Sequence, residues 1–111
     1  MSAALATGLS LVSILLLDDD PTMRSAARNT LRAAGCKTIV QTGDGHDALE
    51  VIGSRHIDLV LCDCQMAPMD GMTFLRRLRA HPAGVNLPVV MLTANNSPED
   101  AWLARELKVA A

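Results

Sequence analysis

The chain has 111 residues, half of them apolar, and its only aromatic residues are Phe74 and Trp102, so we expect one domain with an aliphatic core. The net charge of −2 gives no reason to expect direct nucleic-acid binding, and no apolar stretch is long enough to cross a membrane. Three cysteines make no disulfide framework and fit a reduced, cytoplasmic protein.

The N-terminal segment, residues 1–11, is expected to be a loose lead-in to a single domain at residues 12–111. It has no basic residue and runs into three consecutive aspartates shortly afterwards, which argues against a signal peptide. A continuous apolar run at residues 12–17 is typical of a parallel strand that is covered on both faces.

Asp20 and Pro21 predict the start of the first helix, because Asp caps helices and Pro suits the first helical position. Gly35 is expected to end this helix. Its inward positions are predicted to be Met23, Ala27, Thr30, Leu31 and Ala34.

Three further pairs of a strand and a helix follow. The strands are predicted at residues 38–41, 57–62 and 87–92. The helices are predicted to begin near Asp44, Gly71 and Ser97. This alternation favours an α/β fold with a doubly wound parallel sheet and helices on both of its faces.

Reactive polar residues follow three of these strands at the point where each strand ends. Asp18 and Asp19 follow the first strand, Asp63 follows the third, and Thr93 follows the fourth. Strand ends of this kind meet at the edge of the sheet where ligands bind. Mg²⁺ relieves repulsion between carboxylates and prefers oxygen ligands, and Asp can accept a phosphoryl group. The pattern therefore predicts a site of Mg²⁺-dependent phosphoryl chemistry, with Thr93 as a donor to a phosphoryl oxygen.

Other side chains receive structural interpretations. Cys62 and Cys64 flank Asp63, but no second pair of thiols exists to complete a zinc site. The three histidines are expected to be solvated or to cap helices. The third helix is predicted to expose Arg76, Arg77 and Arg79, and the loop before it is predicted to be packed by Met66 and Met69.

The chain resembles the receiver domains of two-component response regulators over roughly residues 12–109. In that family an acidic pair follows the first strand, as Asp18-Asp19 does here. The family's phosphorylated Asp precedes Met-Pro-x-Met-Asp-Gly, and here this segment reads Asp63-Cys64-Gln65-Met66-Ala67-Pro68-Met69-Asp70-Gly71, with the Pro shifted by one. A Thr or Ser before Ala is matched by Thr93-Ala94.

The resemblance implies a flavodoxin-like sheet of order 2-1-3-4 in this chain. Asp63 would accept a phosphoryl group from a sensor histidine kinase or a phosphotransfer protein. Mg²⁺ would be held by Asp19, Asp63 and the backbone carbonyl of Gln65, with Asp18 acting mainly through water. Thr93 would bind the phosphoryl group and switch the face formed by strand four and helix four. The protein would be a switch that acts on its own phosphorylation and dephosphorylation, not an enzyme with an external substrate.

The family continues with a fifth strand, a Lys that contacts the phosphate, and a fifth helix, all expected beyond Ala111. Lys108 lies in the predicted fourth helix and is not that Lys. We therefore expect strand four to form an open edge of the sheet, which invites a homodimer.

Two other functions compete with this interpretation. Phosphatases of the aspartyl-phosphate type carry Asp-x-Asp at one strand end, and Asp63-Cys64-Gln65 lacks the second acid. A degenerate receiver that only binds proteins stays open: the intact acidic residues and Thr93 argue against it, and the missing Lys argues for it.

Overall fold

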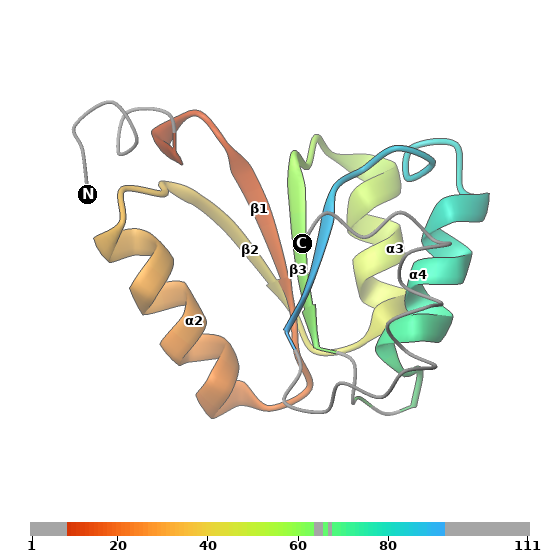
Figure 1. The fold of residues 1–111 in the computed structure, drawn as a ribbon, viewed down its shortest axis with the longest axis horizontal. Helices are drawn as coiled ribbons and strands as arrows, with labels where there is room; N and C mark the ends of the chain where they lie inside the picture. The colour runs from red at the N-terminus through yellow and green to blue at the C-terminus, as the bar shows by residue number, and fades with distance from the viewer. Residues whose placement is uncertain (1–8, 64–65, 67, 93–111) are drawn as a thin grey trace.

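Four strands form one parallel sheet in the computed structural model, which describes residues 9–63, 66 and 68–92. The strands are β1 (Ser13–Leu17), β2 (Thr38–Thr42), β3 (Leu59–Asp63) and β4 (Val89–Leu92). Their order is β2-β1-β3-β4, and every pair is parallel (Figure 1). The predicted sheet type and order are confirmed.

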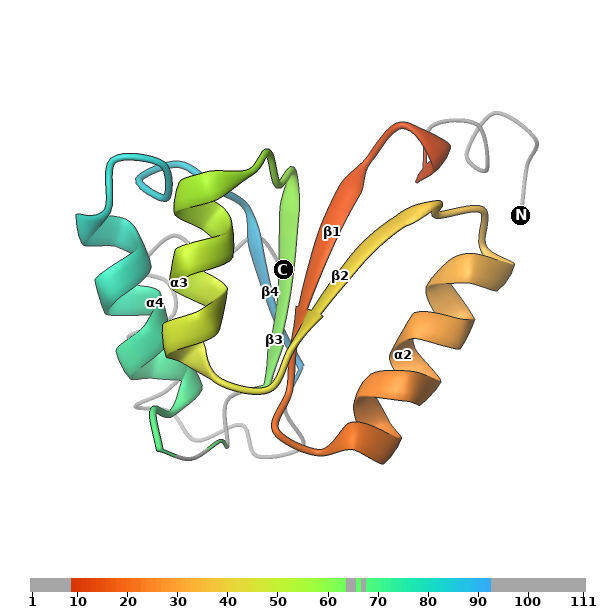
Figure 2. The same ribbon diagram turned by 180° about the vertical axis from the view of Figure 1, so that it is seen from behind.

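Helices cover both faces of the sheet, as expected of a doubly wound fold. Helix α2 (Pro21–Ala33) packs on one face, and α3 (Gly45–Ser54) and α4 (Gly71–Ala80) lie side by side on the other (Figures 1 and 2). The helix predicted from Ser97 lies outside the described residues. No helix within the described part of the chain is both long enough and apolar enough to cross a membrane.

Each described helix begins at an Asp that accepts hydrogen bonds from the first turn. Asp20, Asp44 and Asp70 cap α2, α3 and α4 in this way. After α2, Gly35 has a φ of 105°, a left-handed conformation that glycine adopts without a Cβ clash. The helix starts predicted at Asp20, Asp44 and Gly71 are therefore confirmed by their cap geometry.

Two strands begin two residues later than predicted. β3 begins at Leu59 although Ile57 is already buried, and β4 begins at Val89 although Leu87 is buried. An apolar run indicates which residues are buried, but strand pairing also requires backbone groups that can form hydrogen bonds. Pro88 has no N–H to donate to a neighbouring strand, so β4 begins after it.

The core is unequal on the two faces. Along β1, side chains alternate between them: Leu15 and Leu17 join the large cluster under α3 and α4, and Ile14 and Leu16 join a small cluster under α2. The large cluster surrounds Phe74, which is fully buried. Among the described residues, most of the apolar burial therefore lies on the face that carries α3 and α4.

Three expectations about side chains are corrected or confirmed. Met23 is 58% exposed and Thr30 is exposed, so the inward face of α2 is narrower than predicted. Arg79 is half-buried and donates to the carbonyl oxygens of Gly84 and Leu87 over 2.8 Å and 2.6 Å, so it is not simply solvated. The packing roles of Met66 and Met69 are confirmed, because both are buried in the large cluster.

Candidate functional site

The sheet places three aspartates at the carboxyl ends of neighbouring strands. β1 pairs with β3 so that Leu17, its last residue, lies beside Cys62. Asp18 and Asp19 continue from β1 at that level, and Asp63 is the last residue of β3. Because parallel strands end at the same edge, the three carboxylates converge from residues far apart in the chain.

One carboxylate oxygen from each of Asp18, Asp19 and Asp63 can be chosen so that all three lie within 4.8 Å of one another. Asp18 and Asp63 are half-buried, and Asp19 is exposed. The structure thus brings together three of the five site residues predicted from the sequence. The other two, Gln65 and Thr93, lie outside the described residues.

The turn after β1 is held by a set of local hydrogen bonds. The N–H of Asp18 donates to the carbonyl oxygen of Thr42 over 3.2 Å, and the N–H of Asp20 donates to Oδ1 of Asp18 over 2.9 Å. Nη1 of Arg24 donates to the carbonyl oxygen of Asp18 over 2.7 Å. Asp18 is therefore fixed by both its backbone and its side chain.

The electrostatics of this edge raise the pKa of Asp18 above its ordinary value. Burial of the carboxyl is the main cause, and the hydrogen bond from the Asp20 N–H partly opposes it. The charges of Asp63, Asp19 and Asp20 raise the pKa further. A divalent cation would relieve the repulsion that Asp18 feels from its neighbours, and the all-oxygen donors of this edge fit Mg²⁺. The described residues of this edge therefore fit that metal.

Sequence reasoning missed one residue of this edge. Arg24 was not singled out, although it reaches the backbone of Asp18. A single arginine in the first part of a helix is common on protein surfaces. Only the fold shows that this one turns back toward the strand end.

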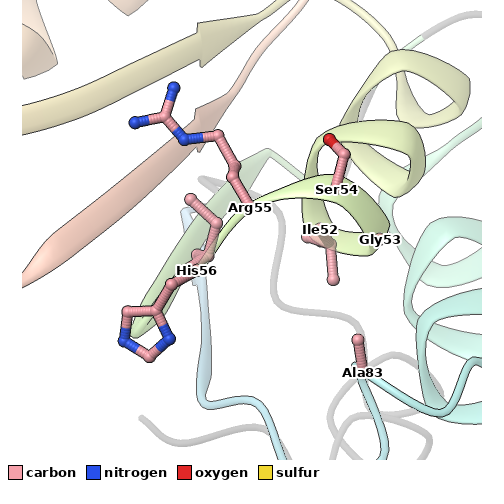
Figure 3. A pocket seen from close by; sticks show the side chains of 7 residues that line it. Ile52, Gly53, Ser54, Arg55, His56 and Ala83 are labelled. Carbon is pink, nitrogen blue, oxygen red and sulfur yellow. The ribbon is translucent and has the colours of Figure 1, made fainter.

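The opposite edge of the sheet has a shallow pocket of about 330 Å³ between the end of α3 and the loop before β4. Its lining includes Ile52, Arg55, His56 and Ala83, and the side chains of Arg55 and His56 point away from Ala83 (Figure 3). His56 instead contacts Asp58 over 2.6 Å. A pocket without converging polar groups is a weaker candidate site than the acidic edge.

The response regulator receiver domain family matches residues 14–110. The chain is 42% identical over 89 residues to the sensor histidine kinase RcsC of Escherichia coli, which covers 78% of this chain and 9% of that protein. It is 36% identical over 87 residues to the gliding motility regulatory protein of Myxococcus xanthus, which covers 78% of this chain and 11% of that protein. The chain thus spans about a tenth of the length of these curated relatives.

A solved structure agrees with the same assignment. The receiver domain of a Pseudomonas aeruginosa sensor histidine kinase, with a magnesium ion coordinated in its active site cleft, matches with a TM-score of 0.78 and 27% identity. The match covers 89% of this chain and 80% of that one. Fold, converging aspartates and sequence similarity agree, and the chain belongs to the response regulator receiver domain family.

Proposed function

We propose that the chain is a phosphoacceptor switch of two-component signalling, in which Asp63 takes a phosphoryl group from a histidine kinase or a phosphotransfer protein. The observation that carries the proposal is the convergence of Asp18, Asp19 and Asp63 at one edge of the sheet, in a chain of the receiver family. Asp63 ends its strand, so its carboxylate belongs to the edge where such sheets bind ligands.

The proposed chemistry is a transfer between two proteins followed by hydrolysis. A carboxylate oxygen of Asp63 attacks the phosphorus of a phosphohistidine: the P–O bond forms as the P–N bond breaks, and the leaving imidazole takes up a proton. Hydrolysis of the acyl phosphate returns the Asp63 carboxylate and inorganic phosphate. The resemblance to the receiver family implies that Gln65 and Asn95, two residues beyond Asp63 and Thr93, flank the attacking water. The chain would therefore act only on itself and have no external substrate to turn over.

Mg²⁺ is the cofactor that the acidic edge fits. When bound, it would neutralise negative charge on the transferring group. Asp19, Asp63 and the backbone carbonyl of Gln65 are the proposed ligands, and Asp18 is proposed to act mainly through water. The raised pKa of Asp18 and the closeness of the three carboxylates support this assignment. The related Pseudomonas domain with a magnesium ion in its cleft supports it as well.

The proposed output is a change in the face formed by β4 and the helix predicted after it. Asp63 pairs with Leu92 in the sheet, and Thr93 is the next residue of the chain. Thr93 is proposed to bind a phosphoryl oxygen and to bias that face, since a new charge can shift a bistable element.

The proposed partner is a sensor histidine kinase or phosphotransfer protein, and the proposed location is the cytoplasm. The similarity to the sensor histidine kinase RcsC supports the link to phosphotransfer signalling. A homodimer through the edge of β4 stays a prediction: in the part of the sheet that is described, β4 pairs with β3 alone.

Intact mass after incubation with acetyl phosphate and Mg²⁺ tests the proposal. We expect wild type to gain one phosphoryl group that hydroxylamine removes, and Asp63→Ala to gain none. Asp70→Asn is the matched control, because Asp70 caps α4 outside the acidic group and Asn keeps the cap. Labelling of the Asp63→Ala variant would show that another residue accepts the phosphoryl group. A folded wild type without any label would favour a domain that only binds proteins.

A further inference from the structure

Arg24 lies in the first part of α2, close to the turn that carries Asp18 and Asp19. Its Nη1 donates to the carbonyl oxygen of Asp18 over 2.7 Å, and its backbone N–H donates to the carbonyl oxygen of Asp20 over 2.9 Å. One residue therefore ties the start of α2 to the turn after β1.

The Arg24 side chain is packed against the protein instead of extending into solvent. Its Nε is buried and has no hydrogen-bond partner among the described residues. A Cβ built on Gly43 would lie 3.4 Å from Nη1, so the guanidinium also reaches the residue that follows β2. A buried donor without a partner costs free energy. The hydrogen bond from Nη1 to the Asp18 carbonyl oxygen offsets part of that cost.

Asp18 is held at three points. Its N–H donates to Thr42, its Oδ1 accepts from the Asp20 N–H, and its carbonyl oxygen accepts from Arg24. Within the described residues, Arg24 is the one side chain that donates to Asp18. It thus helps to fix the backbone from which the Asp18 and Asp19 carboxylates extend.

The charge of Arg24 cannot account for a role in metal binding, because a cation beside the carboxylates repels a second cation. A group that orients metal ligands, by contrast, raises metal affinity. We propose that Arg24 is a positioning residue of the metal site, which strengthens Mg²⁺ binding by holding the Asp18 carbonyl and thereby the turn that presents Asp18 and Asp19. This inference rests on the proposed function.

Mg²⁺ titration by isothermal calorimetry tests it, because the two roles of the guanidinium predict opposite signs. If Arg24 positions the turn, Arg24→Gln weakens Mg²⁺ binding by about tenfold. If only its charge matters, the same variant binds Mg²⁺ more tightly. Arg24→Lys keeps the charge but lacks the planar fork of donors, so we expect it to bind more weakly than wild type as well.

Arg28→Gln is the matched control. Arg28 lies one turn further along α2 and donates to Oδ1 of Asn29 over 3.2 Å, so its loss removes the same charge without touching Asp18. We expect its Mg²⁺ affinity to stay within about twofold of wild type. Melting temperatures without Mg²⁺ show whether each variant is folded, and Arg24→Lys decides the test if Arg24→Gln does not fold.

Equal or tighter binding in Arg24→Gln, or wild-type affinity in Arg24→Lys, would overturn the role of Arg24. If wild type accepts phosphate and binds Mg²⁺ while Arg24→Gln binds equally well, only this inference fails. If wild type binds no Mg²⁺, the metal site of the proposed function fails together with it.

Discussion

At the carboxyl edge of the sheet, Asp18 faces two other carboxylates, whereas at the opposite edge Asp58 accepts hydrogen bonds. Oδ2 of Asp58 accepts from the Ser13 N–H over 2.8 Å, and Oδ1 contacts Nε2 of His56 over 2.6 Å. The pKa of Asp18 is raised, mainly by burial, and the pKa of Asp58 is lowered, mainly by the Ser13 hydrogen bond. The same residue type therefore has opposite electrostatics at the two edges.

The difference separates a polar group that joins two strands from one that lies among like charges. Asp58 extends the pairing of β1 and β3, since its own N–H also donates to the carbonyl oxygen of Ser13 over 2.8 Å. Asp18 is held in place, yet its carboxylate stays among like charges, which is an arrangement that a divalent cation improves. At one edge the carboxylate extends the strand pairing, and at the other it belongs to the proposed metal site.

The largest expected effect is on metal affinity at the carboxyl edge. Asp19→Asn removes one charge and one proposed ligand, so we expect Mg²⁺ affinity to fall by more than about tenfold. Asp20→Asn is its control, because Asp20 caps α2 outside the acidic group and Asn keeps the cap. Calorimetric titration measures both. Similar affinities in the two variants would remove the distinction between the acidic group and ordinary surface charge.

At the opposite edge, Arg79 offers a test of stability without a role in the site. Arg79→Ala leaves the carbonyl oxygens of Gly84 and Leu87 without that donor, and we expect a loss of about 1–3 kcal/mol in the free energy of unfolding. Arg77→Ala, an exposed neighbour on α4, should stay within about 0.5 kcal/mol. Urea unfolding measures the free energy of unfolding of both variants. Equal values for Arg79→Ala and Arg77→Ala would show that the stability of this edge does not depend on Arg79.

A smaller effect is expected on the melting temperature when Asp18 and Asp58 are replaced in turn. Without divalent cations, we expect Asp18→Asn to raise the melting temperature, because it relieves repulsion and keeps an acceptor for the Asp20 N–H. Asp58→Asn should lower it, because the group loses a charge that Ser13 and His56 stabilise. If both variants shifted the melting temperature in the same direction, the two aspartates would not differ in the way described.

The smallest expected effect is on pH dependence. The pKa of Asp58 in the folded protein lies below the ordinary pKa of an aspartate, so its ionised form contributes stability at pH values above that ordinary pKa. This contribution is lost as the pH falls through the folded pKa. The difference in melting temperature between wild type and Asp58→Asn should therefore be present at neutral pH and vanish in strong acid. If the difference in melting temperature did not depend on pH, the effect of Asp58→Asn would come from packing and not from the charge of Asp58.

Much of the fold and the acidic group follows from local sequence. Apolar runs that end in Asp18 and Asp63 identify central strands together with their reactive ends. Asp20 and Asp44 mark helix starts by chemistry that acts within one turn. The meeting of the carboxylates then follows from the rule that parallel strands end at one edge.

Contacts between distant segments could not be predicted in this way. Asp58 bonds Ser13 across the sheet, and Arg79 bonds a loop whose path depends on β4. The exposure of Met23 depends on how closely α2 approaches the sheet, which helical periodicity alone does not determine. The Arg24 contact is local, six residues from Asp18, but its partner is a backbone carbonyl, which leaves no signal in the sequence.

The most direct test of the comparison is an NMR titration of the labelled protein with Mg²⁺ at neutral pH. We predict saturable shifts of the backbone amides at residues 18–20 and at Asp63, and none at residues 56–58. Saturable shifts at Asp58, or no saturable shift at the carboxyl edge, would contradict the assignment of the acidic group as the metal site.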